Sequence, residues 1–275
     1  MGRRMGHERW TDHTVREWLV CGPFPAFGNG RPPTNRDRWE TGLRQAVAND
    51  YLGEHGGESG IAPASGMAHM SATGTCQWGP VESDTDLIDL AALYPQQAHP
   101  VAYAWAEFDA VDPGPTLLAI GSEARYQNSV QVWINGQRVY DRWVLRRTRY
   151  GDDLVLVDLQ SGRNTVLIKP TSVHAGWGFT FRVVGPLFAP KALLNAACRG
   201  HVPVIEYLLA MDTPIDATDR MGETAPHHTA RHDQSDVASL LLARGPAAHT
   251  PCAPSPHPLA ALQGRQTCLP PLPPA

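Results

Sequence analysis

Apolar and polar residues alternate along short runs over the first two thirds of the chain, and most runs end at turn residues. In VQVWING, Val130, Val132 and Ile134 fall on one side of an extended chain and Trp133 on the other. In GWGFTFRVVG, the aromatic residues again occupy every second position. A period of two indicates half-buried β-strands. We count about eight or nine such strands over residues 17–185 and predict no helix among them, which favours an antiparallel β-sandwich of the jelly-roll kind.

Two features of this region carry further predictions. Asn135-Gly136 stands between two strand-like runs and predicts a β-hairpin, because both central residues of a type I′ turn need positive φ. We therefore expect residues 130–134 and 138–142 to pair. A stretch over about residues 26–85 is rich in Gly, Pro and Asn and is too long for an ordinary connection. We expect it to wrap the sandwich edge or to carry function.

From about Pro190 the apolar period becomes helical, and residue pairs recur 33 positions later. Ala196-Ala197 corresponds in this way to Thr229-Ala230, and Leu208-Leu209 to Leu241-Leu242. The string ALLNAACRGHVPVIEYLLAMDTPIDATDRMGETAPHHTA resembles one ankyrin repeat running into the next, over about residues 190–245. The resemblance implies paired helices that bind a protein partner. Fewer than two full repeats are present, whereas about three are needed for independent stability.

Several strings of the β-rich region resemble galactose-binding-like jelly-roll domains, over roughly residues 17–185. They are WLVCGPFP, YLGEHGGE, GSEARYQNSVQVWINGQRV, SGRNTVLIK and GWGF. Such domains accompany bacterial glycoside hydrolases and exported carbohydrate-related proteins. The resemblance implies that the sandwich binds a sugar or packs beside a catalytic domain. The domain organisation that we predict is a disordered N-terminus (1–13), the sandwich (14–188), the ankyrin-type helices (189–245) and a Pro-rich disordered tail (246–275).

Composition and charge exclude several classes of function. The formal net charge is −4 and charged residues make up only 18% of the chain, so the basic face of a nucleic-acid-binding protein is not expected. No run approaches 18 apolar residues, so we predict no membrane span. The N-terminus reads MGRRMGHERWTDHT and has no apolar stretch typical of a signal peptide. As written, the chain is expected in the cytoplasm, and it would be exported if the N-terminus were incomplete.

Motifs for nucleophilic, phosphate-binding or dinucleotide-binding chemistry are missing from the sequence, so we predict no enzyme, no catalytic residue and no cofactor. Glu54, His55 and Glu58 in YLGEHGGES would suit a metal or acid–base site, or simply a solvated loop packed on the sandwich. His228 and His232 have a zinc-like spacing of four, but the sequence shows no third ligand, and no metal is predicted. The five cysteines form no CxxC pair, so a disulfide framework is not expected, although a Cys21–Cys76 bridge stays open.

Tryptophan gives the best indication of a ligand. Trp133 is out of phase with the apolar side of its strand, and Trp143 follows the predicted hairpin. An exposed indole stacks well on the apolar face of a sugar ring. Alternatively, each ring is half-buried under residues 26–85. The candidate ligand-binding residues are therefore Trp133, Trp143, Glu54 and Glu58. The function that we predict is non-catalytic carbohydrate binding. The alternatives are protein–protein interaction through the ankyrin-type segment, or a fragment of a larger protein associated with a glycoside hydrolase.

Overall fold

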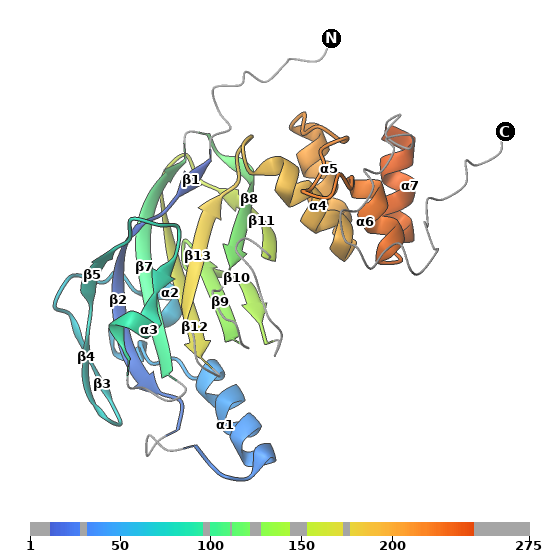
Figure 1. Ribbon diagram of the computed structural model, residues 1–275. Coiled ribbons are helices and arrows are strands. Elements are labelled where there is room, and N and C mark those ends of the chain that lie inside the picture. Colours follow the sequence, from blue (N-terminus) through green and yellow to red (C-terminus); the bar gives the residue numbers. More distant parts are fainter. Residues whose placement is uncertain are drawn as a thin grey trace. The chain divides into compact units, whose positions relative to one another are not determined.

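The computed structural model describes residues 12–27, 32–95, 100–110, 112–121, 128–143, 153–172 and 177–244 (Figure 1). The chain divides into two compact units, residues 1–185 and 186–275. The two predicted disordered ends, 1–13 and 246–275, lie outside the described residues except for Asp12 and His13.

The first unit contains two antiparallel sheets, as the alternation predicted. Six strands form the larger sheet in the order β10 (Gln137–Arg142), β9 (Asn128–Ile134), β12 (Gly162–Ser172), β7 (Pro100–Ala110), β2 (Glu17–Pro25) and β5 (Gly79–Glu82). The smaller sheet has the order β1 (His13–Thr14), β13 (Gly178–Val183), β8 (Gly114–Gly121) and β11 (Asp153–Leu159), with β6 (Ile88–Asp89) also on β13. A separate pair is formed by β3 (Ala68–Ser71) and β4 (Gly74–Gln77).

The main core contains apolar side chains from both sheets, including Val132 of β9 and Leu118 of β8. The aromatic residues of β13 point into it as predicted, and Trp18 of β2 meets Phe179 and Phe181 edge to face, at ring-centroid distances of 4.9 and 5.9 Å. Such edge-to-face pairs add to the stability that area burial supplies. Alternate residues of the larger sheet face the other way and are available to build its outer face.

The predicted hairpin is confirmed. Strands β9 and β10 pair antiparallel with Ile134 opposite Gln137. Asn135 and Gly136 have φ of 51° and 78°, the positive values that a type I′ turn needs. The Asn135 side chain also fixes the turn to β12, because its Oδ1 accepts a hydrogen bond from the Thr165 N–H at 2.8 Å.

The prediction that residues 17–185 contain no helix was wrong. The stretch over residues 26–85 holds α1 (Arg36–Ala48), the 3₁₀ turn η2 (Gly53–His55) and the single turn α2 (Gly57–Gly60), and α3 (Leu90–Leu93) follows later. Asn35 caps α1 by accepting a hydrogen bond from the Arg38 N–H at 3.0 Å. The buried stripe of α1 is short, namely Leu43, Ala46 and Val47. The half-buried Trp39 packs beside Leu43, and most of the other positions are charged or polar. Such a narrow stripe is hard to recognise in a polar sequence.

This segment covers the outer face of the larger sheet. A second apolar cluster joins Ala46, Leu52 and Ile61 of the covering segment to Phe24, Trp133 and Leu167 of the sheet. We expected residues 26–85 to wrap the sandwich edge or to carry function, whereas much of the segment covers a face of the larger sheet. Cys21 and Cys76 are both buried, free thiols within the same cluster, so they form no disulfide.

The second unit is helical in its described residues, as predicted from the change of period. It comprises α4 (Ala189–Arg199), α5 (Val202–Ala210), α6 (Ala225–Arg231) and α7 (Ser235–Arg244). Helix α4 packs against α5 and α6, and α7 packs against α5 and α6. At the start of α6, Nδ1 of His227 accepts a hydrogen bond from the Thr224 N–H at 3.2 Å. In the described part of the chain, every helix is too short or too polar to cross a membrane.

Candidate functional site

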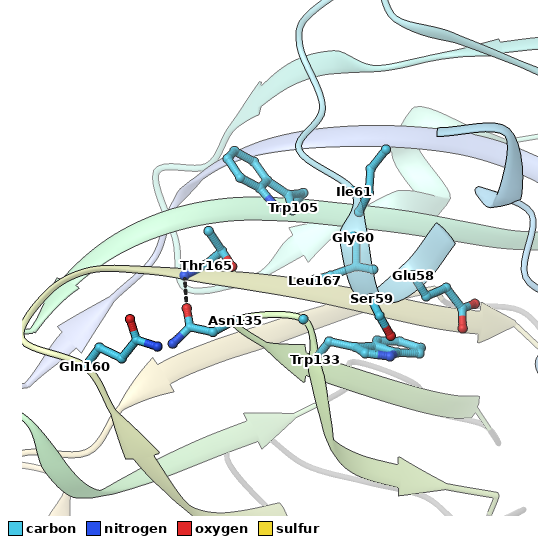
Figure 2. Close-up of a pocket in the computed structure, with 11 residues that line it drawn as sticks. Glu58, Ser59, Gly60, Ile61, Trp105, Trp133, Asn135, Gln160, Thr165 and Leu167 are labelled. Carbon is cyan, nitrogen blue, oxygen red and sulfur yellow. Dashed lines mark hydrogen bonds between the residues drawn. The ribbon is translucent and has the colours of Figure 1, made fainter. Parts of the chain in front are cut away.

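A pocket of about 270 Å³ opens on the outer face of the larger sheet, between the sheet and α2 (Figure 2). Its lining comes from α2, from strands β7, β9 and β12, from the β9–β10 turn, and from the connection between β11 and β12. Segments far apart in sequence therefore meet here, with Glu58 and Ser59 on one side and Asn135 and Gln160 on another.

The floor of the pocket is a row of three apolar side chains on adjacent strands. Leu167 of β12 lies opposite Trp105 of β7 on one side and opposite Trp133 of β9 on the other. Residues directly opposite in neighbouring strands have Cβ atoms about 5 Å apart, so the three side chains form a continuous strip. Trp105 is half-buried, whereas Trp133 is only 3% exposed.

Glu58 is held in place by two buried or nearly buried donors. Its Oε1 accepts a hydrogen bond from the Tyr103 hydroxyl at 2.7 Å and from Nζ of Lys169 at 2.7 Å. Among the described residues, none donates to Oε2. The fixed carboxylate therefore keeps one oxygen that can accept a hydrogen bond from a ligand.

Lys169 is buried in the sheet, and its ammonium group is satisfied by three oxygens. Besides Glu58, Nζ donates to the carbonyl oxygens of Val47 and Asn49, each at 2.7 Å. Burial lowers the pKa of Lys169, and the nearby Glu58 carboxylate opposes that effect. Burial raises the pKa of Tyr103, and the Glu58 carboxylate raises it further. Tyr103 is thus a neutral donor, and the position of Glu58 is set by a network that spans the sheet and its covering segment.

Two glycines permit the close approach of α2 to the rest of the site. A Cβ on Gly136 would lie 2.3 Å from the Ser59 carbonyl oxygen, so the hairpin turn touches the backbone of α2. A Cβ on Gly57 would lie 2.5 Å from Oδ2 of Asp50, the atom that accepts the Glu58 N–H at 3.0 Å. Both glycines have positive φ, so side chains are disfavoured there for a second reason.

The rim of the pocket carries polar groups that have no partner in the described part of the chain. Asn135 is occupied, because it accepts from the Thr165 N–H and donates to Oδ1 of Asn164 at 2.9 Å. Figure 2 shows the Asn135 side chain turned toward the backbone of Thr165. Within the described residues, the hydroxyls of Ser59 and Thr165 and the side-chain amide of Gln160 make no hydrogen bond. They are donors and acceptors available to a polar ligand.

The structure brings two of the four sequence-predicted site residues together. Glu58 and Trp133 both line the pocket. Trp133 is buried with residues of the 26–85 segment, as in the alternative interpretation of the tryptophans, and is not an exposed platform. Glu54 is exposed on η2, outside the pocket lining. Trp143 lies elsewhere, half-buried with the Arg44 guanidinium 4.7 Å from its ring centroid.

Sequence reasoning missed Trp105, the half-buried indole of the floor. A usable signal was present in VAYAWAEF, where Trp105 is out of phase with Ala102, Ala104 and Ala106. Those three alanines face the main core, so Trp105 must point to the outer face.

No known protein-family model matches the sequence. Solved structures with partial similarity include β-glucosidase from Kluyveromyces marxianus in complex with glucose, at 11% identity and a TM-score of 0.30, covering 44% of this chain and 16% of that one. A family 35 carbohydrate-binding module from Clostridium thermocellum is similar at 13% identity and a TM-score of 0.25, covering 32% of this chain and 72% of the module. A β-glucuronidase from Ruminococcus gnavus is similar at 11% identity and a TM-score of 0.33, covering 66% and 30%.

The chain thus spans only a small part of the two glycosidases that it partly matches. At these identities and TM-scores, the similarities do not indicate the function of this chain. A function can be inferred only from the geometry and chemistry of the pocket. They do not bear on the ankyrin resemblance of residues 190–245, which stays a prediction.

Proposed function

We propose that the first unit binds carbohydrate without catalysis, in the pocket between the larger sheet and α2. The observation that carries this proposal is the half-buried indole of Trp105, at one end of the row Trp105–Leu167–Trp133, bordered by polar groups that have no partner among the described residues. A sugar ring has an apolar C–H face and a rim of hydroxyls. An indole can stack on that face, while the hydroxyls bond Oε2 of Glu58 and the free groups of Ser59, Thr165 and Gln160.

The size of the pocket suits a short saccharide or the end of a longer one. Pockets for drug-sized ligands usually measure about 300–1,000 Å³. The 270 Å³ found here is slightly below that range and is open to the rim groups described above. We therefore propose a mono- or disaccharide unit as the occupant.

The chemistry of the lining supports binding without hydrolysis. Glycosidases commonly use a pair of carboxyl groups on either side of the scissile bond. Among the residues that line the pocket, Glu58 is the acidic one, and its Oε1 is engaged by Lys169 and Tyr103. A single carboxylate held in this way suits recognition of a hydroxyl better than proton transfer.

The experiment is a glycan array with the full-length chain, followed by calorimetric titration of any glycan retained. Trp105→Ala should weaken binding of that glycan by about tenfold, which corresponds to about 1.4 kcal/mol of lost stacking. The matched control is Trp143→Ala, which removes an indole outside the pocket and should leave the affinity unchanged. Absence of any retained glycan, or equal effects of the two substitutions, would refute the proposal.

The alternative is a protein-binding role for the helical unit. Positions 33 residues apart are equally buried there: Ala196 and Leu208 are 0% exposed, and Thr229 and Leu241 are 1% exposed. This equivalence is what stacked ankyrin-type repeats require. A chain that retains no glycan but binds a defined protein partner through α4–α7 would favour this alternative.

A further inference from the structure

Three metal-ligating side chains meet in the helical unit, and none of them belongs to the lining of the proposed carbohydrate pocket. Cys198 lies in the last turn of α4, His228 lies on α6, and His232 directly follows α6. Their ligand atoms all lie within 4.8 Å of one another. Sγ of Cys198 is 3.3 Å from Nδ1 of His228. The structure thus supplies the third ligand that the spacing of His228 and His232 lacked.

We propose that Cys198, His228 and His232 form a binding site for a transition-metal ion of the zinc type. Thiolate and imidazole are the ligands that Zn²⁺ prefers, and hard cations such as Mg²⁺ and Ca²⁺ prefer oxygen. Three protein ligands leave the fourth tetrahedral position to a water molecule. His228 and His232 are four residues apart, which places them on the same side of a helical turn.

The surroundings of His228 fit this role. Its Nδ1 faces Cys198, and its Nε2 lies 3.3 Å from Oδ2 of Asp219. Nε2 is buried and, among the residues that the structure describes, forms no hydrogen bond of good geometry. A metal ion on Nδ1 would leave the ring proton on Nε2. The Asp219 carboxylate could then accept a hydrogen bond from Nε2–H. A histidine that binds a metal usually donates a hydrogen bond from its other ring nitrogen to a carboxylate, a backbone carbonyl or water. This bond orients the ring and raises its basicity.

Asp219 is itself held in position. Its Oδ1 accepts hydrogen bonds from the backbone N–H groups of Met221 and Glu223, at 2.8 and 3.0 Å. These contacts leave Oδ2 directed at His228. Asp219 is therefore a positioning residue in this proposal, and the metal is bound by Cys198, His232 and Nδ1 of His228.

A second set of donors, Asp219, Glu223 and His228, also lies within 4.8 Å. We assign the ion to the first set because Oε1 of Glu223 pairs with Arg231. A cation bound by Glu223 would lie beside the guanidinium and be repelled by it. The two donor sets predict different effects of substitutions on metal binding, so experiment can distinguish them.

A metal ion at this place would join α4 to α6. Helices α4–α7 span only the 56 residues from Ala189 to Arg244, and folded units below about 70–80 residues commonly need a disulfide, a metal or a partner for stability. Because a site of this kind is not assembled in the unfolded chain, the free energy of metal binding becomes free energy of folding. We therefore expect the ion to stabilise the helical unit.

The test uses the full chain carrying Cys252→Ser and Cys268→Ser, which removes the two thiols outside the described residues. After treatment with a chelator, this protein is titrated with Co²⁺ and then with Zn²⁺. We expect the near-ultraviolet thiolate-to-cobalt band, tetrahedral visible bands, their loss on adding Zn²⁺, and a higher melting temperature of the helical signal with Zn²⁺. No thiolate band in this background would overturn the proposal.

Substitutions then identify the ligands. Cys198→Ser should abolish the thiolate band, and His232→Gln, at an exposed position, should weaken Co²⁺ affinity at least tenfold without loss of helix content. Asp219→Asn should weaken the Co²⁺ affinity by roughly 10–100-fold while keeping the thiolate band, as expected for a residue that orients a metal ligand without binding the metal. A band that survives Cys198→Ser would refute the assignment. Loss of binding on Glu223→Gln with no effect of Cys198→Ser would place the ion in the second donor set.

Discussion

At the scale of single residues, Lys169 shows how a buried charge connects the sheet to the segment that covers it. Its side chain is fully buried, and its three acceptors all belong to the covering segment. The rings of Tyr51 and Tyr103 have their centroids 5.5 Å from Nζ and complete the environment of the cation. Removing one partner of a buried ion pair is costly because it leaves the other charge without compensation.

We predict that Lys169→Met lowers the free energy of unfolding by about 3 kcal/mol, because Glu58 and two backbone carbonyls lose their donor. Denaturant titration of the first unit measures this change. The matched control on the same strand is Arg163→Met, which removes an exposed ion pair with Glu107 and should cost less than about 0.5 kcal/mol. If the two substitutions have the same effect, Lys169 does not hold the covering segment in place.

At the scale of elements, the contact between the β9–β10 turn and α2 shapes the pocket. The turn was predictable from Asn135-Gly136 alone, because its conformation is local. Its contact with Ser59 was not predictable, since it depends on how a segment from much earlier in the chain folds back over the sheet. We did not predict α1 for the same reason. Its few apolar residues indicate a buried helix face only when the sheet that they pack against is known.

We predict that Gly136→Ala is more destabilising than Gly162→Ala. Both glycines have positive φ, 78° and 80°, so both substitutions carry the same backbone strain of about 1 kcal/mol. A Cβ on Gly162 meets nothing within 4 Å, whereas one on Gly136 lies 2.3 Å from the Ser59 oxygen. The additional loss should be at least about 1 kcal/mol, by analogy with overpacked sites, and should appear as a lower denaturation midpoint. Equal midpoints for the two variants would contradict the contact between the turn and α2.

At the scale of the whole molecule, the sequence was most informative where structure follows from local periodicity. Alternation predicted the antiparallel sheets, and the change to a helical apolar period predicted the helices of the second unit. The candidate site was only half predictable. Glu58 and Trp133 were identified, but the neighbouring Trp105 and the buried Lys169 were not. Their roles arise from the pairing of β7, β9 and β12, which brings together residues that no local pattern connects.

The pH dependence of global stability should contain a contribution from His69. Its Nε2 accepts the Trp78 indole N–H at 2.9 Å, so the folded state requires the neutral ring. Burial lowers the pKa of His69 below the usual 6.5, and His55 lowers it further. The unfolded chain therefore takes up more protons between pH 6.5 and the lower pKa of the folded state. This stabilisation is complete above about pH 6.5 and is lost as the pH falls through the folded-state pKa.

The prediction is checked by melting temperatures of the wild type and His69→Gln as a function of pH. The glutamine keeps an acceptor for Trp78 but does not titrate, so its melting temperature should fall less steeply below pH 6.5. Parallel curves for the two proteins would show that His69 does not contribute to the acid sensitivity.

The acceptors of Lys169 also have a consequence for the order of folding. Its hydrogen bonds to Val47, Asn49 and Glu58 span 122, 120 and 111 residues of chain. Closing loops of that length costs entropy before any contact compensates for it, and proteins rich in such distant contacts fold slowly. Until the loop closes, the ammonium group remains hydrated on the outer face of the sheet, beside apolar side chains that the covering segment later buries. We therefore expect its last water molecules to leave only when the covering segment docks, so that dehydration of a single cation marks the end of folding for this face.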